Sequence, residues 1–243
     1  MGIFGGTNQL IMDYYLRQIG SSNPNVIRAE PDAQQIADAA AARLAPVGTL
    51  ASIKDDYMNL QPRESEGLDF RVFYSVRNTP TGDWRISLNA SQKLKLYQEP
   101  SEQHQTLLDA LAAGVISGVS ISGVEDLIGR NGRPEWKMTA SVTWSLGPWT
   151  SGWYSSYVSE FDDTSATYVN TEIPWVIKEW LTHNLYFQYE FDKDGPAGGA
   201  RLRVGARNIF DEDPPLADDR FGYSGSVHSN RGRWWYASIR KSF

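Results

Sequence analysis

Apolar and polar side chains alternate strictly along much of the chain. From Met138 to Ser145 every second residue is apolar, and each residue between them carries a hydroxyl group. The stretch 84–96 repeats the pattern, with Gln92 as its exception. Successive side chains of a β-strand point to opposite faces, so this period of two predicts strands with one apolar and one polar face. Shorter alternating stretches lie at 10–16, 68–76, 185–191 and 202–206.

Eight strands follow from the alternation, and the links between them alternate between short and long. The short links are rich in turn residues. All short turns therefore lie at one end of the sheet and all long loops at the other. The expected strands lie near 7–18, 57–78, 83–98, 134–145, 148–162, 174–191, 200–209 and 232–243. The short links are 79–82, 146–147 and 192–199, and the long links are 19–56, 99–133, 163–173 and 210–231.

This arrangement is typical of bacterial outer-membrane proteins, which have short periplasmic turns and long extracellular loops. The fold class that we predict is all-β: an antiparallel up-and-down segment of a transmembrane β-barrel. Two long links also carry helical patterns. Asp32–Leu44 begins with a capping aspartate, and Ser101–Ala113 begins with a capping serine. The apolar stretch 107–124 is broken by an aspartate and three glycines, so we do not expect it to span a membrane as a helix.

Composition supports a barrel and excludes several other classes. The 243 residues include nine tryptophans, twelve tyrosines and 21 glycines, although only 41% are hydrophobic. Membrane barrels combine these features, because half of each strand faces water while aromatic girdles mark the interfaces. The chain has no cysteine, which excludes disulfides, thiolate metal sites and a cysteine nucleophile. A net charge of −6 argues against a nucleic-acid partner.

Charge is divided between loops and strands. The four long links hold 17 acidic and 7 basic residues, whereas the rest of the chain holds 12 acidic and 16 basic residues. An eight-stranded barrel is only wide enough for packed side chains, and burying unpaired cations there costs several kcal/mol each. We therefore expect a wide, hydrated or plugged lumen, with these strands as one arc of a larger barrel. The basic residues on the polar strand faces are Arg71, Arg77, Arg85, Lys93, Lys95, Arg201, Arg203 and Arg207.

The most specific motifs stand near the C-terminus. Residues 203–215 read Arg-Val-Gly-Ala-Arg-Asn-Ile-Phe-Asp-Glu-Asp-Pro-Pro, and residues 232–243 read Gly-Arg-Trp-Trp-Tyr-Ala-Ser-Ile-Arg-Lys-Ser-Phe. Together they resemble the end of TonB-dependent outer-membrane receptors, which have a strand, an Asn-Leu-Phe-Asp-like turn with prolines, a loop and a last strand ending in phenylalanine. Further family habits match at 13–15 (Asp-Tyr-Tyr), 23–24 (Asn-Pro) and 66–70 (Glu-Gly-Leu-Asp-Phe). The resemblance runs over nearly the whole chain.

The resemblance implies a 22-stranded barrel with an N-terminal plug that TonB rearranges. The implied function is uptake of a scarce nutrient of the ferric siderophore, cobalamin or oligosaccharide class, in the outer membrane of a Gram-negative bacterium. It also implies a barrel-assembly signal at the C-terminus, although Lys241 stands where the family often has an aromatic residue. The residues of that signal are Trp235, Ala237, Ile239 and Phe243.

The sequence departs from the family by omission. No plug, TonB box or signal peptide is present, and only about the last third of the strands is present. We therefore expect residues 1–243 to be the C-terminal part of a receptor barrel. Its expected partners are outer-membrane lipid, the missing N-terminal barrel and plug, TonB acting through the plug, and a small-molecule nutrient. Eight strands alone leave two unpaired edges, which lipid does not tolerate.

No constellation of residues predicts catalysis, a metal or a cofactor. His104, His183 and His228 lie in separate segments without metal-ligand spacing, and we expect them to be exposed or lumen-facing polar residues. The acidic run at 211–213 with 218–219 lacks the order of a calcium loop. Nucleophile elbows, Walker loops and dinucleotide motifs are also missing. The chain is therefore not expected to be an enzyme.

Aromatic residues in the long loops are the candidates for ligand binding. Tyr168, Phe221 and Tyr223 offer rings for stacking a sugar or a chelate. Two other classes stay open from the sequence alone. One is a small stand-alone eight-stranded outer-membrane barrel with a structural or adhesive role. The other is a soluble lipocalin-like barrel, in which the apolar face points inward around a ligand.

Overall fold

The computed structural model describes residues 6–43, 45–55, 61–121, 123–171 and 173–241, which fall into two compact units. The first unit comprises Met1–Arg63 and Gln98–Glu125, and the second comprises Glu64–Tyr97 and Asp126–Phe243. Within the described residues, no helix has the length and apolar character needed to cross a membrane. The first unit contains α1 (Gly6–Gln18), β1 (Val26–Arg28), α2 (Ala33–Ala41), β2 (Leu50–Ile53) and α3 (Glu102–Ala112).

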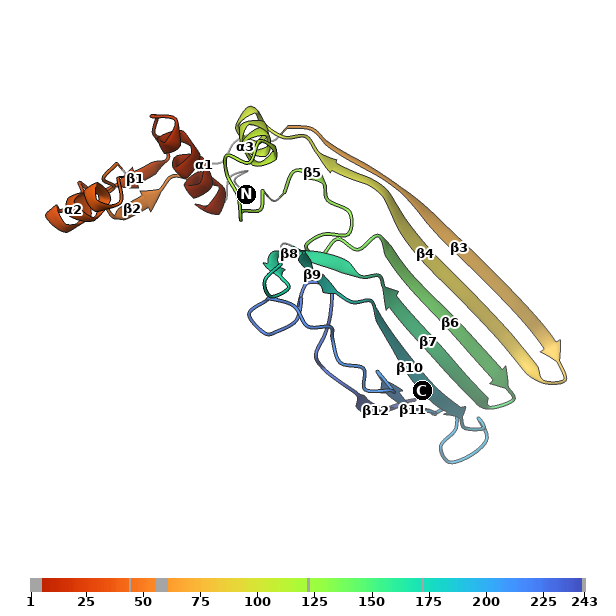
Figure 1. Ribbon diagram of the computed structural model, residues 1–243. Coiled ribbons are helices and arrows are strands. Elements are labelled where there is room, and N and C mark those ends of the chain that lie inside the picture. Colours follow the sequence, from red (N-terminus) through yellow and green to blue (C-terminus); the bar gives the residue numbers. More distant parts are fainter. Residues whose placement is uncertain (1–5, 44, 56–60, 122, 172, 242–243) are drawn as a thin grey trace. The chain divides into compact units, whose positions relative to one another are not determined.

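The second unit is built on an antiparallel up-and-down sheet, and the fold is mostly β (Figure 1). Seven strands follow one another across the sheet in chain order, and the two-residue β5 (Glu125–Asp126) pairs with β4. Among the described residues β3 and β12 are the two edges, so the sheet is not closed. The strands in order are β3 (Arg63–Thr79), β4 (Gly82–Gln98), β6 (Trp136–Leu146), β7 (Trp149–Val158), β10 (Trp180–Glu190), β11 (Arg201–Arg207) and β12 (Trp234–Arg240).

Seven of the eight expected strands are confirmed, and so is the alternation of short and long connections. Two residues join β3 to β4 and two join β6 to β7, at the same end of the sheet as the connection from β10 to β11 (Figure 1). The long link after β7 is more ordered than we expected. It contains a separate hairpin of β8 (Phe161–Thr167) and β9 (Pro174–Ile177), which shortens the strands expected at 148–162 and 174–191. The expected strand 57–78 begins in residues that lie outside the described part.

The strand registers from β4 to β12 place most of the apolar residues of these six strands on one face. Ile86 pairs with Val142, Val142 pairs with Trp153, and the row continues to Leu185 and Ala206. Most of the large side chains on this face are exposed, because no second layer covers them. Polar members of this face include Gln92, Ser151, Ser155 and His183. Its large exposed apolar members in β4 to β12 are Trp84, Ile86, Leu88, Leu94, Leu146, Trp149, Leu181, Phe187, Val204, Trp235 and Ile239. In β3, the exposed Phe70 and Val72 flank Arg71, which bonds Asn89 on the opposite face.

The opposite face is polar, and most of its basic side chains form hydrogen bonds or ion pairs with neighbouring residues of the sheet. The Arg71 Nε donates to Asn89 Oδ1 at 2.9 Å, and Arg201 pairs with Glu190 at 3.0 Å. Lys95 forms an ion pair with Glu64, and Arg203 donates two hydrogen bonds to Gln188. Neutral amides of the sheet therefore bond part of the positive charge that led us to expect a wide, hydrated or plugged lumen.

A row of alternating glycine and tyrosine crosses the polar face from β7 to β12. Gly152, Tyr186, Gly205 and Tyr236 are successive cross-strand partners. A Cβ atom on Gly152 would lie 2.2 Å from Tyr186 Cε1, and one on Gly205 would lie 2.7 Å from Tyr236 Cζ. Each ring therefore lies against the backbone of a glycine, which supplies the space that any other residue would fill. Arg203 covers the Tyr186 ring, with 4.3 Å between its Cζ and the ring centroid.

The strand that we expected at 7–18 is wrong, because this segment forms helix α1. The period-two set at 10–16 omits Ile11 and Tyr15, which complete a helical stripe of Ile11, Met12, Tyr15 and Leu16. The Asp-Tyr-Tyr motif at 13–15 consequently lies on a helix instead of a strand. The helix ends at Gln18 and is followed by Gly20, whose φ of +84° favours glycine, and Ser21 N donates to Leu16 O at 2.7 Å.

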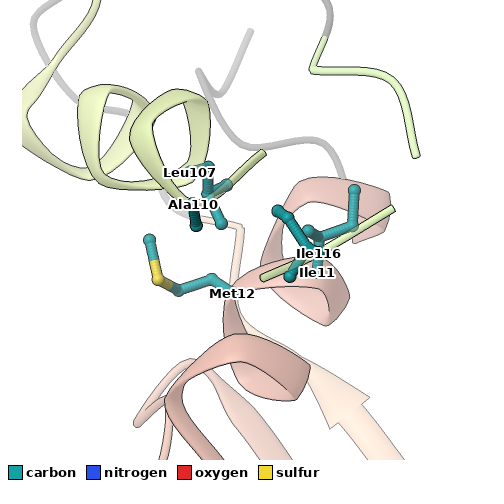
Figure 2. Close-up of a cluster of buried hydrophobic side chains, with 5 residues drawn as sticks. All are labelled: Ile11, Met12, Leu107, Ala110 and Ile116. Atoms are coloured by element: carbon teal, nitrogen blue, oxygen red, sulfur yellow. The ribbon is translucent and has the colours of Figure 1, made fainter. Parts of the chain in front are cut away.

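A small apolar core holds the first unit together (Figure 2). Ile11 and Met12 of α1 meet Leu107 and Ala110 of α3, and Ile116 joins them from the segment after α3. Leu107 is fully buried. The buried carboxylate of Asp13 accepts two hydrogen bonds from Arg28, and this ion pair ties α1 to β1.

Both helices that we expected in the long links are confirmed, with their caps. The Asp32 side chain accepts from Gln35 N at 2.8 Å, and Gln35 Oε1 accepts from Asp32 N, which completes a capping box for α2. Ser101 Oγ accepts from His104 N at 3.3 Å at the start of α3. These local signals were sufficient because a cap is formed by residues three positions apart.

Candidate functional site: a pocket at the loop end of the polar face

A cavity of about 490 Å³ lies on the polar face, at the end of the sheet where the long loops attach. Trp180, Thr182 and Asn184 line it from β10, Arg207 lines it from the end of β11, and Trp234 lines it from the start of β12. Alternation along β10 points these three side chains to the same face, opposite Leu181 and His183. The remainder of the lining comes from the loop that connects β11 to β12.

The loop leaves β11 through a turn that Asn208 builds. Its Oδ1 accepts from Glu212 N at 3.0 Å, and its Nδ2 donates to Glu212 O at 2.9 Å. Asn208 and Asp211 both adopt positive φ, at 48° and 61°, which asparagine and aspartate tolerate better than most residues. Asn208 N donates to Asn184 Oδ1 at 2.9 Å, so the turn is fixed against β10. The Asn-Ile-Phe-Asp sequence therefore places Arg207 at the rim of the cavity.

Two indole groups hold the middle of the loop above the sheet. Trp175 Nε1 donates to Leu216 O at 2.9 Å, and Trp180 Nε1 donates to Asp213 O at 3.1 Å. Leu216 also forms an isolated bridge with Tyr223. The loop is therefore attached to β9 and β10 as well as to its own two strands, so the lining that it contributes is held in place.

His228 is a buried residue of this loop. Its ring stacks on Phe161 of β8, with centroids 5.9 Å apart and planes at 5°, and meets the edge of Trp180 at 5.4 Å. Neither ring nitrogen has a hydrogen-bond partner among the described residues. Burial lowers the pKa of His228 below its ordinary value, and the positive charge of Lys137 lowers it further. The ring is therefore held neutral, with one donor and one acceptor unmatched.

The charged residues of the lining are two arginines, and no carboxylate lines the cavity. The Arg207 guanidinium lies over the Trp234 ring, with 4.9 Å between Cζ and the centroid. Arg231 reaches the cavity from the loop. Neither guanidinium forms an ion pair with the described carboxylates. The site thus has net positive character, although the loops around it are acidic overall.

The three loop aromatics expected to bind ligand occupy different places. Tyr223 lines the cavity. Phe221 is exposed in the same loop, with Arg220 over its ring, outside the lining. Tyr168 lies in the β8–β9 hairpin and packs on Trp175 at 4.9 Å. The structure therefore brings only Tyr223 to the pocket, and the binding role of all three stays a prediction.

The expected assembly signal lies on the last strand. Trp235, Ala237 and Ile239 share the apolar face of β12, and Phe243 lies outside the described residues. The expectation for the three histidines is wrong. His104 and His228 are buried, and His183 lies on the apolar face, where Ser155 Oγ and its Nδ1 are 2.8 Å apart. Sequence patterns missed His228 because its burial depends on Phe161 and Trp180, which belong to other strands.

No group of three or more potential metal-ligating side chains forms among the residues that the structure describes. The expected acidic run instead serves the turn at the end of β11. Asp211 Oδ1 accepts from Arg233 N at 2.6 Å, and the two side chains form an ion pair at 3.9 Å. The chemistry that the cavity offers is therefore binding through guanidinium, imidazole and aromatic groups.

Comparison with known proteins gives distant structural likenesses. No protein-family model matches the chain, and no curated protein matches it. The ferric citrate transporter FecA in its unliganded form aligns with 72% of this chain and 28% of its own, at 15% identity and a TM-score of 0.41. The copper transporter OprC aligns with 71% of this chain and 27% of its own, at 14% identity and a TM-score of 0.32. The chain thus spans little more than a quarter of the length of either transporter.

Proposed function

We propose that the chain is a wall segment of an outer-membrane receptor that transports a scarce nutrient into a Gram-negative cell. The observation that carries the proposal is the continuous, uncovered apolar face of the seven-stranded sheet, opposite a polar face. Soluble proteins rarely expose apolar patches larger than a few hundred Å². Lipid hydrocarbon would remove the apolar face from water and so remove the free-energy cost of exposing it, while the polar face would line a hydrated lumen.

The lengths of five of the seven strands agree with a membrane of ordinary thickness. A transmembrane β-strand needs about 9–11 tilted residues. β6 and β10 have 11 residues each, β7 has 10, and β3 and β4 have 17 each, whereas β11 and β12 have 7 each. The longer pair extends beyond such a span at one end or both. Short turns at one end of the sheet and long loops at the other match the periplasmic and extracellular sides of such proteins.

The two edges of the sheet define what else the receptor needs. Backbone groups of β3 and β12 that have no partner in this sheet require one in lipid, where water cannot bond them. We propose that these partners are the remaining strands of a barrel of the 22-stranded type, carried by the same gene product or by a separate chain. A plug in that barrel would receive energy from TonB. The nutrient would be of the ferric siderophore, cobalamin or oligosaccharide class, captured by the long loops.

The absence of cysteine from the chain makes a direct test simple. Single cysteines at Val204 on the apolar face and at Arg203 on the polar face are labelled with a fluorophore in membranes that contain the protein. A lipid-borne quencher should dim the label at 204 strongly and the label at 203 weakly. Quenching by a water-soluble agent should show the reverse order.

Two outcomes contradict the proposal. If the protein partitions into the aqueous phase after detergent phase separation and the label at 204 escapes both quenchers, the apolar face points into a soluble protein, as in a lipocalin-like barrel. If the chain, expressed alone, runs as a closed heat-resistant monomer, no partner strands are needed and a small stand-alone barrel is the better description.

A further inference from the structure

The cavity at the loop end of the polar face has the size and fixed walls of a small-molecule site. Its volume of about 490 Å³ falls within the usual range of ligand pockets, about 300–1,000 Å³. Strand residues line one part of it, and the loop that lines the rest is bonded at Leu216 and Asp213 to the indoles of Trp175 and Trp180. A ligand would therefore enter a largely formed pocket instead of ordering a free loop.

The charged side chains of the lining favour an anionic ligand. Arg207 and Arg231 line the cavity without a carboxylate beside them, so a cation would meet repulsion and an anion would meet two donors. Trp234 covers one face of the Arg207 guanidinium, which leaves the planar edge, where the N–H groups are, for an oxyanion. Guanidinium and carboxylate match in geometry and form paired, charge-assisted hydrogen bonds.

His228 is a second and independent sign of a missing ligand. A buried polar atom without a hydrogen-bond partner is costly, and native proteins rarely keep one without a reason. His228 keeps two such atoms, while stacking on Phe161 and the edge of Trp180 hold the ring in place. His228 lines the cavity, so a ligand that moves a neighbouring side chain aside can offer one of these buried nitrogens a partner.

We propose that this pocket binds a small organic carboxylate, with Arg207 and Arg231 holding the carboxylate group and His228 bonding a second polar group of the same molecule. Aromatic side chains, above all Tyr223 and Trp180, pack against its carbon skeleton. The inference rests on the receptor function proposed above, because it names the class of nutrient that such a receptor takes. It favours an acidic ligand over the neutral sugar that loop aromatics alone suggest.

Binding of benzoate to the full-length protein, purified in detergent, tests the proposal by titration calorimetry. Benzamide has the same shape without the charge, and inorganic phosphate is an oxyanion without a carbon skeleton. We expect benzoate to bind saturably, and benzamide and phosphate to bind at least tenfold more weakly. R207Q and R231Q should each weaken benzoate binding about tenfold or more, as expected when a charge-assisted hydrogen bond is lost.

R220Q is the matched control, because Arg220 has the same charge in the same loop but lies outside the lining. It should leave benzoate binding unchanged. His228→Phe keeps an aromatic ring for stacking and removes both nitrogens, and is expected to weaken binding of salicylate, which carries a hydroxyl beside its carboxylate, more than binding of benzoate. If R207Q does not fold, R231Q, which alters only the loop, carries the test.

Several results would overturn the inference. If benzamide binds as tightly as benzoate, the site does not discriminate by charge. If phosphate binds as tightly as benzoate, the site does not require an organic acid. If R220Q loses as much benzoate affinity as R207Q and R231Q, the loss is an unspecific effect of charge. The quencher experiment distinguishes failure of the carboxylate pocket from failure of the proposed receptor function. A chain that faces lipid but does not bind benzoate refutes the carboxylate pocket alone, and a chain that binds benzoate in the aqueous phase refutes the membrane receptor alone.

Discussion

The two units of the chain differ in whether their apolar side chains are buried. In the first unit, Leu107 is fully buried and Ile116 is 2% exposed, within a cluster that α1 and α3 share. In the sheet of the second unit, Trp235 is 72% exposed and Ile239 is 76% exposed, on a face that no other element covers. The residue types are alike, so the hydrophobic effect acts on both with the same strength per area.

The difference shows which region is complete by itself. The first unit removes the apolar groups of this cluster from water by its own packing. The sheet gains nothing from its apolar face until another apolar phase covers that face, and lipid is the phase that we propose. Substitutions in the first unit should therefore act through packing, whereas those on the apolar face of the sheet should act through transfer to the membrane.

Leu107→Ala should have the largest effect, because it opens a cavity in the small core of the first unit. Truncation of a buried leucine costs about 2–5 kcal/mol. Hydrogen exchange of the α1 and α3 amides should accelerate accordingly, with the sheet amides unchanged. Ile36→Ala is the control, since Ile36 is exposed on α2 and its loss should matter little. Equal acceleration in the sheet would mean that the two units unfold together.

Val142→Lys tests the opposite region. Val142 lies in the middle of β6 on the apolar face, and its neighbour Ser141 lies on the polar face. A lysine at the centre of a bilayer on the lipid side costs about 2–4 kcal/mol, whereas one on the lumen side costs little. Membrane-assembled Val142→Lys should therefore be extracted by much less urea than Ser141→Lys. Equal resistance of the two variants would break the comparison, because the faces would then meet the same solvent.

Gly152→Ala should disturb the polar face by about 1–3 kcal/mol, as expected for overpacking. The new Cβ would displace the Tyr186 ring, and with it the contact of that ring with Arg203. Urea denaturation of the assembled protein measures the loss. Tyr186→Ala in the Gly152→Ala background should remove most of the further cost, because the clash is gone. Gly195→Ala is the control, since its Cβ would meet only Asp192 O, at 3.5 Å.

Features of the fold that depend on residues close together in the sequence could be predicted from it, whereas features that depend on contacts between distant segments could not. The strands at 84–96 and 138–145 were predictable because alternation is local, and the registers then follow from keeping apolar residues on one face. The α1 segment was misjudged because Leu10, Met12 and Leu16 fit a period of two while Ile11 completes a helical stripe. A short amphipathic segment satisfies both periods, and packing against α3 decides between them.

The pocket was only partly predictable, for the same reason. Tyr223 was found because aromatic residues in a loop are visible in sequence. Arg207 was assigned to the polar face correctly, but its position at a cavity depends on the turn that Asn208 forms with Asn184 of another strand. His228 was taken for an ordinary polar residue, because nothing near it in sequence indicates the stacking on Phe161.

The smallest effect that we predict is the dependence of the second unit on pH through His228. Burial holds the pKa of this ring below its ordinary value of 6.5, so the unfolded chain takes up the proton first as the pH falls. Stability from the neutral ring is fully present above pH 6.5 and is lost as the pH falls below it towards the folded-state pKa. His228→Phe keeps the ring and abolishes this titration. The unfolding temperatures of the two proteins should therefore differ by a constant amount above pH 6.5. At lower pH the unfolding temperature of the unchanged protein should fall relative to that of the variant. If the two curves stay parallel across the whole pH range, the ring is not held neutral.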